Sequence, residues 1–228
     1  LLATGDHVVS VYPAYQSLHQ VAADLGCVVE RWEPQEEDGW RFDPAQLERL
    51  VRPETRLIVV NFPHNPTGSL PTQAEFRRVV EIARACGAHL FCDEMYRLLE
   101  QDPADRLPSG VEVYEKAVTL FGMSKTFGLA GLRLGWLATH DEELRGKLST
   151  FKDYLTICGS APSELLALMA LRDREAIAQR HVRRIAANLE VLGEFVKAHS
   201  DLLRFAPPRA GSVCFPHLLA EESATEFA

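Results

Sequence analysis

The stretch VTLFGMSKTFGLAGLRLGW, residues 118–136, begins as an apolar run and then places Ser124 and Lys125 among glycines and apolar residues. The run predicts a buried strand, and a lysine in the turn after it has no obvious solvated face. Burying an ammonium group is costly unless it is paired or converted, and a Schiff base with an aldehyde cofactor is one such conversion. Further on, Arg133 occupies a turn bounded by glycines, where it can meet an anion. A glycine-rich loop with an exposed Lys and Arg is the alternative that this stretch alone leaves open.

Short apolar strands alternate with helical patterns around this stretch, from residue 5 to about residue 139. The predicted strands cover residues 7–11, 27–32, 56–61, 89–92, 117–121 and 134–138. The predicted helices cover residues 16–25, a short segment opened by Asp43 and Pro44, and residues 71–86, which Gly87 ends. This alternation predicts an α/β fold, a mostly parallel, doubly wound sheet with helices on both faces. In such sheets, functional groups collect beyond the carboxyl ends of the strands.

The pattern changes after His140, and three further helices are predicted, over residues 141–154, 163–171 and 174–199. Two short strands and the opening of a final helix follow, at residues 203–205, 212–215 and 221–228. The two strands predict the start of a smaller α+β unit. We therefore expect residues 1–172 to form a large domain, and residues 173–228 to form a linking helix and the beginning of a small domain.

The composition is that of an ordinary globular protein, with 46% hydrophobic and 25% charged residues among 228. A net charge of −8, with no compensating Lys/Arg cluster, argues against a nucleic-acid partner. No apolar stretch approaches the length of a membrane span. The five cysteines are scattered without a Cys-x-x-Cys pair, which favours reduced thiols in a cytoplasmic protein over a disulfide framework or a zinc site.

Three more features fall at predicted strand ends or in the turns after them. Asn65 opens the sequence Asn-Pro-Thr-Gly, which by itself is a strong turn signal. Asp93 opens the sequence Asp-Glu-Met-Tyr, which ends at Tyr96 and would equally suit a helix N-terminus with an acidic first turn. Tyr15 follows the first predicted strand, where an aromatic residue is more often packed than stacked on a ligand. Each feature alone is weak evidence for a site.

Together these residues supply what pyridoxal phosphate requires. The cofactor needs a lysine for its aldehyde, a carboxylate that keeps the ring nitrogen protonated, and donors for the phenolate oxygen. It also needs an aromatic side chain over the ring and an arginine or backbone donors for the phosphate. These roles fall, in that order, to Lys125, Asp93, Asn65 with Tyr96, Tyr15 and Arg133. The carboxylate matters most, because a protonated ring nitrogen lets the ring accept the electron pair left when a bond at the substrate α-carbon breaks.

The order Asn-Pro-Thr-Gly, Asp-Glu-x-Tyr, Ser-Lys and Gly-Leu-Arg-Leu-Gly-Trp resembles the class I/II aminotransferases, the fold-type-I pyridoxal-phosphate enzymes. The resemblance covers essentially the whole chain. It implies that Lys125 forms the Schiff base and later shuttles a proton between the α-carbon and carbon C4′ of the cofactor. It also implies that Asp93 pairs with the ring nitrogen. The other implied contacts are Asn65 and Tyr96 at the phenolate oxygen, Tyr15 on the ring, and Arg133 and Ser124 at the phosphate.

The chain departs from the family pattern at Gly122, where many members carry a serine that binds the phosphate. The resemblance places the family's glycine-rich phosphate loop before Leu1 and its arginine for the substrate carboxylate beyond Ala228. The chain also begins without Met, in what looks like the end of a helix. We therefore expect a chain that is truncated at both ends and that binds the cofactor poorly or not at all by itself. By resemblance, the parent protein is a homodimer in which each site borrows residues from its partner.

The leading hypothesis is an aminotransferase that moves an amino group between an amino acid and a 2-oxo acid. A lyase, decarboxylase or cyclase on the same fold uses the same carbanion chemistry, and these motifs do not separate it. A third alternative is a non-catalytic, cofactor-binding effector domain of a transcription regulator. A dinucleotide site is a poor alternative, because Gly128, Gly131 and Gly135 are not spaced as Gly-x-Gly-x-x-Gly.

Overall fold

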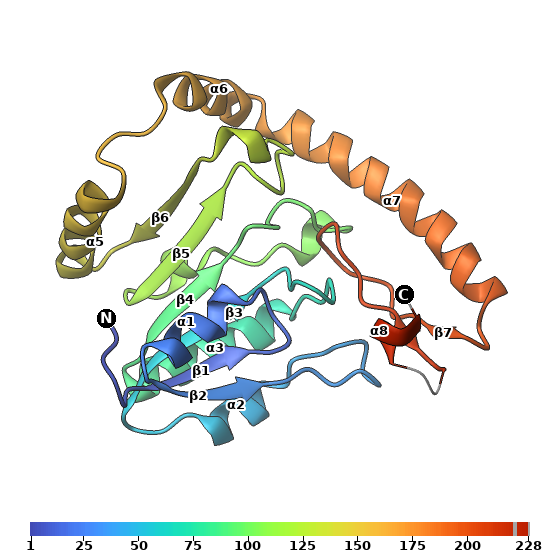
Figure 1. Cartoon of the computed structure of the whole chain (residues 1–228), viewed down its shortest axis with the longest axis horizontal. Coiled ribbons are helices and arrows are strands. Elements are labelled where there is room, and N and C mark those ends of the chain that lie inside the picture. Colours follow the sequence, from blue (N-terminus) through green and yellow to red (C-terminus); the bar gives the residue numbers. More distant parts are fainter. Residues whose placement is uncertain (221–222, 228) are drawn as a thin grey trace.

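The computed structural model describes residues 1–220 and 223–227, and its centre is a six-stranded sheet (Figure 1). The strands are β1 (His7–Val11), β2 (Val28–Trp32), β3 (Thr55–Asn61), β4 (His89–Asp93), β5 (Ala117–Gly122) and β6 (Gly135–Thr139). Their order across the sheet is β2-β1-β3-β4-β5-β6. The first five strands run parallel, while β6 runs antiparallel to β5. The prediction of a mostly parallel α/β sheet is confirmed.

The antiparallel direction of β6 follows from the short connection that joins it to β5. This connection contains only the 3-10 helix η2 (Ala130–Leu132), and Gly122 of β5 pairs directly with Gly135 of β6. A parallel return would need a longer crossover, usually through an α-helix that packs on the sheet. The chain therefore turns back at the edge of the sheet, and this turn carries Ser124 and Lys125.

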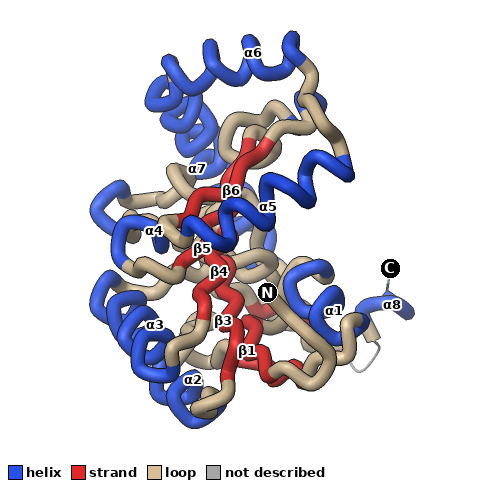
Figure 2. Tube along the Cα trace, turned by 90° about the vertical axis from the view of Figure 1, so that its left-hand side faces the viewer, coloured by secondary structure: helices blue, strands red, loops and turns tan. Residues whose placement is uncertain are grey.

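Helices cover both faces of the sheet. The helices next to it are α1 (Ser17–Asp24), α2 (Pro44–Leu50), α3 (Gln73–Cys86) and α4 (Gly110–Val113), with the 3-10 helix η1 (Pro103–Asp105) before α4. Figure 2 shows α2, α3 and α4 on one side of the strands and α1 on the other. Helix α3 begins at a capping box formed by Thr72 and Glu75. Gly87 ends it in the left-handed conformation, as the sequence predicts for the end of this helix.

The main core lies between the sheet and the pair α2 and α3. Trp32, Phe42 and Phe62 meet there edge to face, with ring centroids 5.1–6.2 Å apart. All three side chains are almost completely buried. Trp32 Nε1 donates a hydrogen bond to the carbonyl of Asp43, the residue that caps α2. This packing fixes the strands whose carboxyl ends carry the predicted site residues.

Beyond β6 the chain forms an arc of helices outside the sheet (Figure 1). The remaining elements are α5 (Glu142–Leu155), α6 (Ala161–Arg172), α7 (Arg174–Ala198), β7 (Leu203–Arg204), β8 (His217–Leu218) and α8 (Ala224–Phe227). Strands β7 and β8 pair as an antiparallel ribbon. Among the residues that the structure describes, no helix has both the length and the apolar character needed to cross a membrane.

The predicted strand over residues 212–215 is wrong. The backbone just before it is already engaged elsewhere, because Ala210 N donates to the carbonyl of Gly68 and Gly211 N donates to the carbonyl of Leu99. These bonds tie the segment to two loops at the carboxyl edge of the sheet. The antiparallel ribbon consequently forms further along the chain, at β8.

Two other predictions concern the end of the chain. Part of the predicted helix over residues 221–228 is present as α8, while residues 221, 222 and 228 lie outside the described residues. The boundary between a large domain, residues 1–172, and the beginning of a small domain stays a prediction.

Candidate functional site

A cavity of about 570 Å³ runs along one face of β3, β4 and β5, beside α1, to the carboxyl ends of these strands. The structure brings all seven predicted site residues to its lining: Tyr15, Asn65, Asp93, Tyr96, Ser124, Lys125 and Arg133. They come from four separate loops, each of which follows a different strand. Their assembly in one place is a consequence of the parallel sheet, because parallel strands present their carboxyl ends at the same edge.

Asp93 ends β4 and is only 6% exposed. Its Oδ1 accepts a hydrogen bond from Met95 N at 3.0 Å. Burial raises the pKa of the Asp93 carboxyl, and the Met95 hydrogen bond and the charge of Lys125 offset this only in part. No helix follows Asp93, because the chain makes tight turns from Glu94 onwards. The carboxylate is therefore a buried charge that faces a cavity, and a cationic group bound there would stabilise it.

Asn61 holds the ends of two neighbouring strands together, and the sequence prediction missed it. It lies opposite Asp93 in the register of β3 and β4 and is 1% exposed. Its Nδ2 donates to the Asp93 carbonyl at 3.1 Å, and its Oδ1 accepts from Asn65 N at 2.8 Å. One amide side chain thus sets the position of Asp93 relative to Asn65. The available signal was a polar residue at the end of the apolar run Leu57–Val60, since a buried amide needs partners.

Lys125 lies in the turn after β5, where Gly128 N donates to the Lys125 carbonyl at 3.0 Å. The expectation that this lysine has no solvated face is wrong, because Lys125 is exposed at the opening of the cavity. Thr126 and Phe127 fill the interior instead, and the Thr126 hydroxyl donates to the carbonyl of Arg97 at 2.7 Å. The turn is therefore fixed to the loop after β4, while the Lys125 side chain stays exposed.

Tyr96 closes one side of the cavity and is 4% exposed. Burial raises the pKa of its phenol, and the nearby charge of Asp93 raises it further. The Tyr96 side chain is therefore a protonated hydrogen-bond donor at neutral pH. Lys125 Nζ lies 6.0 Å from the centre of its ring. A Cβ at Gly211 would lie only 3.4 Å from Tyr96 Cδ1, so that the backbone at Gly211 packs against the Tyr96 side chain.

Tyr15 and Arg133 lie at the rim of the cavity. Tyr15 is 62% exposed, which leaves its ring free to cover a ligand. Arg133 is also exposed, and its backbone adopts the left-handed conformation with φ 51° after η2. A non-glycine residue in this conformation costs about 1 kcal/mol or more. Arg133 Nη1 donates to the Ala130 carbonyl at 3.0 Å, which leaves the rest of the guanidinium free for an anion.

His64, to which the sequence assigns no role, connects the loop of Asn65 to the core. It is 1% exposed, and its Nδ1 lies 2.7 Å from Thr67 Oγ1, which itself accepts a hydrogen bond from Ser69 N. The buried imidazole is neutral at pH 7, whichever of the two atoms donates in this contact. Burial lowers the pKa of His64 to about 3 despite the nearby carbonyl of Pro13. The ring thus stands between the loop that carries Asn65 and the loop that carries Tyr15.

Glu94 is a second buried carboxylate beside Asp93, but it is absent from the lining of the cavity. Gly110 N donates to its Oε1 at 2.8 Å and Ser109 Oγ donates to it at 2.9 Å. Burial raises the pKa of Glu94, and these hydrogen bonds and Arg97 counteract the rise. Its contacts attach the end of β4 to the start of α4, which makes it a structural neighbour of the site.

The fold and the side chains at its carboxyl edge define an α/β protein in which a lysine and a buried aspartate share one cavity. The whole chain, residues 1–228, matches the family described as aminotransferase class I and II, and the protein belongs to this family.

Several relatives support this membership. Capreomycidine synthase from Streptomyces vinaceus is 30% identical over 97% of this chain and 56% of its own length. The probable N-succinyldiaminopimelate aminotransferase DapC from Mycobacterium tuberculosis is 33% identical over 77% of this chain and 45% of its own. The structure of a PLP-dependent aminotransferase from Streptococcus suis matches with a TM-score of 0.92 and 33% identity, over 100% of this chain and 59% of that chain. The structure of the PLP-dependent cyclase OrfR matches with a TM-score of 0.89 and 32% identity, over 99% of this chain and 60% of that chain. This chain therefore spans about half the length of the curated relatives it matches.

Gly122, where we expected many family members to carry serine, has little room for a side chain here. A Cβ at this position would lie 3.1 Å from the Leu134 carbonyl oxygen and 3.2 Å from Gly135 Cα. Both contacts are with the backbone of the returning chain, so that a side chain would push β6 away from β5. The close pairing of the two strands accounts for the glycine.

Proposed function

We propose that the whole protein is an aminotransferase, which moves an amino group between an amino acid and a 2-oxo acid with pyridoxal phosphate as its cofactor. One observation carries the proposal: seven side chains with the required chemistry, supplied by separate loops, line one cavity. The relatives from Streptococcus suis and Mycobacterium tuberculosis support it by their own descriptions. The five free cysteines support a cytoplasmic location, in which thiols stay reduced.

Pyridoxal phosphate, when bound, supplies a ring that accepts the electron pair from a bond broken at the substrate α-carbon. Asp93 is suited to keep the ring nitrogen protonated, because a cationic partner offsets the cost of its buried charge. Lys125, at the opening of the cavity, is suited to hold the aldehyde carbon of the cofactor. With an amino acid bound in the cavity, the amine of Lys125 would be placed to move a proton at the substrate α-carbon.

The remaining side chains bind and orient the cofactor. Tyr96 and Asn65 would donate hydrogen bonds to the phenolate oxygen, for which the raised pKa keeps Tyr96 protonated. Tyr15 is exposed at the rim and would cover the ring. Arg133 and Ser124 would hold the phosphate, because a planar guanidinium matches the oxygen geometry of the anion.

We further propose that the protein is a homodimer. The arc of helices exposes a set of large apolar side chains, namely Phe151, Tyr154, Leu155, Ile157, Leu165 and Met169. Tyr154 is 87% exposed and Ile157 is 74% exposed, although both are large side chains that favour burial. Apolar side chains grouped in this way are typical of an interface between proteins.

The second candidate is a cyclase on the same fold. The specific observation in its favour is that capreomycidine synthase and OrfR match this chain almost as well as the aminotransferase from Streptococcus suis does: they are 30% and 32% identical over 97% and 99% of it, against 33% over 100%. A cyclase and an aminotransferase would share the roles of Lys125 and Asp93, because both break a bond at the same carbon. They differ in the product that leaves the site.

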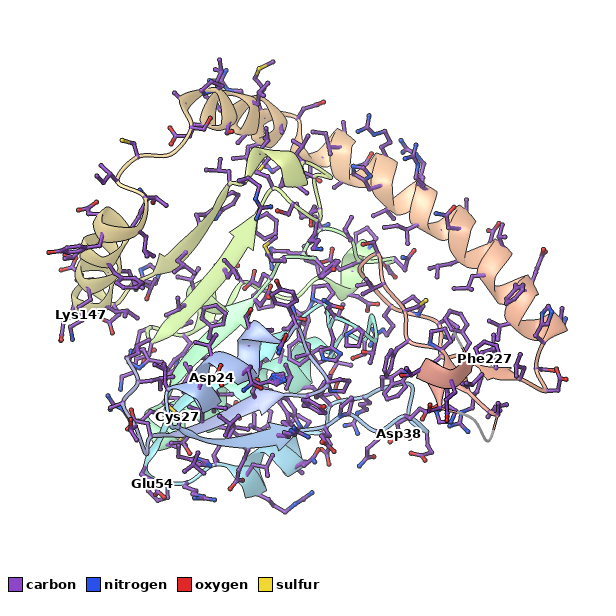
Figure 3. All side chains as sticks on the ribbon, in the orientation of Figure 1. Asp24, Cys27, Asp38, Glu54, Lys147 and Phe227 are labelled. Atoms are coloured by element: carbon purple, nitrogen blue, oxygen red, sulfur yellow. The ribbon has the colours of Figure 1, made fainter. Side chains whose placement is uncertain are left out.

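The proposal is tested on the whole gene product, mixed with pyridoxal phosphate and then reduced with borohydride. We expect a visible absorbance band that disappears on reduction, and peptide mapping that places the reduced cofactor on Lys125. The variant Lys125→Ala should lose the band. The control Lys147→Ala should keep it, because Lys147 is an exposed residue of α5 that does not line the cavity (Figure 3). Label on another lysine would overturn the assignment of Lys125.

Incubation with a panel of amino acids and 2-oxo acids then distinguishes the two candidates. Conversion of a 2-oxo acid to its amino acid supports the aminotransferase. A cyclised product without a new amino acid supports the cyclase. A protein that carries the cofactor on Lys125 but converts no amino acid would contradict both activities.

A further inference from the structure

Glu100 is a buried carboxylate in the loop after β4, and the proposed function does not use it. It is 3% exposed and lies four residues after Tyr96. Arg106 Nε donates to Glu100 Oε2 at 3.0 Å, which gives the buried charge the partner that it needs. The other oxygen, Oε1, accepts a hydrogen bond from Leu98 N at 3.0 Å. The side chain therefore holds the backbone two residues before it, in the turn that contains Tyr96.

Leu98 is the residue on which the Glu100 carboxylate acts. Its backbone has φ 74°, in the left-handed region that residues other than glycine rarely adopt. This conformation is costly for a leucine, and it persists only where the surrounding structure enforces it. The bond from Leu98 N to Glu100 is such a constraint, because it orients the peptide group on one side of this dihedral angle. Leu99 N then donates to the Tyr96 carbonyl at 3.1 Å, so that the conformation of Leu98 determines how the turn closes.

Glu100 also lies where a later segment of the chain docks. Its backbone forms an antiparallel bridge with Ala210, and Gly211 N donates to the Leu99 carbonyl at 3.0 Å. The backbone at Gly211 packs against the Tyr96 side chain. A displacement of Glu100 would therefore loosen Tyr96 through two connections, the turn before Glu100 and the segment that pairs with it.

We propose that Glu100 is a positioning residue for Tyr96, which it holds where the Tyr96 hydroxyl can donate to the phenolate oxygen of the cofactor. The inference rests on the proposed function, in which Tyr96 is one of two donors to that oxygen. Glu100 does not line the cavity of the site, so it acts through the backbone of Leu98 and not by contact with a ligand. A role in stability alone would leave the properties of the bound cofactor unchanged, which makes the two roles separable.

The first experiment follows amide hydrogen exchange in the whole gene product without cofactor. Glu100→Ala removes the acceptor of Leu98 N, and we expect exchange at Leu98 to become at least about tenfold faster. Exchange at Gly211 should also become faster, because Gly211 N donates to the residue that follows Leu98. The matched control is Glu115→Ala, which removes a surface ion pair of the same 3.0 Å length and should leave both amides unchanged.

The second experiment measures the pH midpoint at which the visible absorbance of bound pyridoxal phosphate changes. A donor to the phenolate oxygen stabilises its anionic form, so that loss of the Tyr96 hydrogen bond raises this midpoint. We expect Tyr96→Phe to raise it by about one pH unit or more, and Glu100→Ala to raise it as well. The double variant should match Tyr96→Phe alone, because Glu100 acts through the tyrosine. Glu115→Ala should leave the midpoint unchanged.

An unchanged midpoint in a folded Glu100→Ala variant would overturn the inference, as would an equal rise with and without the Tyr96 hydroxyl. Unchanged exchange at Leu98 would also overturn it, whether or not the protein binds the cofactor. If Glu100→Ala does not fold, Glu100→Gln serves in its place. It keeps an acceptor for Leu98 N but loses the charge, and we expect a rise about half as large, with no rise counting against the inference. A protein that shows the coupled shift but transfers no amino group contradicts only the proposed function.

Discussion

The sheet and the arc of helices outside it use apolar residues in opposite ways. All five residues of β1 are buried, and β5 has five of its six buried. By contrast, the 25 residues of α7 include two buried ones, Ala178 and Val196, and the 14 residues of α5 include one, Leu144. The inner strands of the sheet are covered by their own chain, whereas the arc and the neighbouring edge strand β6 leave apolar side chains at the surface.

This difference separates two tasks of the molecule. The seven predicted site residues all lie between Tyr15 and Arg133, on loops held by the sheet. Rigid elements position a site more accurately than mobile ones. The arc offers the apolar surface that we assign to the dimer. In the proposed function, the first region therefore holds the chemistry and the second supplies the interface.

The largest expected effect is a difference in stability between two variants, each of which replaces one aromatic residue by alanine, one in the sheet and one in the arc. Trp32 is fully buried in the sheet core, whereas Tyr154 on α5 is 87% exposed. We expect Trp32→Ala to lower the free energy of unfolding by about 3–5 kcal/mol. Tyr154→Ala should change it by less than about 0.5 kcal/mol when the protein is dilute enough to be monomeric. Urea unfolding measures both values, and similar losses would mean that Tyr154 is covered within its own chain.

The next effect concerns His64, whose pKa burial lowers to about 3. The unfolded chain takes up this proton near the ordinary value of 6.5, while the folded chain does not. The stabilising effect is therefore complete above pH 6.5 and is lost as the pH falls towards 3. The slope is about 1.4 kcal/mol per pH unit for one proton, which amounts to about 2 kcal/mol at pH 5.

The variant His64→Gln should lose this part of the acid sensitivity, because glutamine does not titrate in this range. Unfolding of both proteins at pH 7 and pH 5 measures the difference. The control is His140→Gln, at an exposed position between β6 and α5, which should retain the slope of the wild-type protein. An unchanged slope in His64→Gln would show that another group causes the acid sensitivity.

A smaller effect is expected at the apolar surface of the arc. Glutamate in place of both Tyr154 and Leu165 should weaken self-association at least about tenfold, because charges are depleted from the buried centre of an interface. Sedimentation over a range of protein concentrations gives the dissociation constant. The control Lys147→Glu adds acidic charge to α5 outside this apolar set and should leave association intact. If the double variant associates as the wild type does, the apolar surface of α5 and α6 is not the dimer interface.

The fold and the grouping of the site were predictable because both follow from local patterns. Alternating strands and helices imply a parallel sheet, and the parallel sheet brings the residues after its strands to one edge. This is why Asp93 and Asn65, which are distant in sequence, line the same cavity. The ends of α3 were predictable for the same reason, since the cap at Thr72 and the stop at Gly87 are local features.

The exposure of Lys125 was not predictable in this way. Apolar neighbours do not determine which residue of a turn points inwards, and here the hydrogen bonds of Thr126 to the loop after β4 decide it. The bridging role of Asn61 depends on the register between β3 and β4, which only the folded sheet defines. The segment 212–215 failed as a strand because its neighbour Ala210 bonds to Gly68, a partner far away in sequence. Each of these features depends on long-range contacts.

The smallest expected effect is a gain in stability at the centre of the site. Burial raises the pKa of Asp93 above its ordinary value of 3.8. Between the ordinary pKa and the raised pKa, the folded chain holds the proton of Asp93 more tightly than the unfolded chain does. The free energy of unfolding therefore falls as the pH rises from the lower pKa to the higher one, and it stays lower at pH 7. Asp93→Asn removes this buried charge, and we expect it to stabilise the cofactor-free protein by about 1 kcal/mol. With pyridoxal phosphate bound, the wild-type protein should be more stable than Asp93→Asn, because the ring nitrogen of the cofactor would pair with the Asp93 carboxylate.

Asp141, at the start of α5, provides the opposite case and the control. Its Oδ1 accepts from Leu144 N at 2.9 Å, and this bond together with His89 lowers the pKa of its carboxyl. Asp141→Ala should therefore destabilise the cofactor-free protein, by about 1 kcal/mol for a lost helix cap. Thermal unfolding with and without cofactor compares the two variants. A gain at Asp93 beside a loss at Asp141 would identify one carboxylate as kept for chemistry at a cost in stability and the other as kept for the fold. A loss at both positions would instead mean that the hydrogen bond from Met95 N outweighs the burial of Asp93.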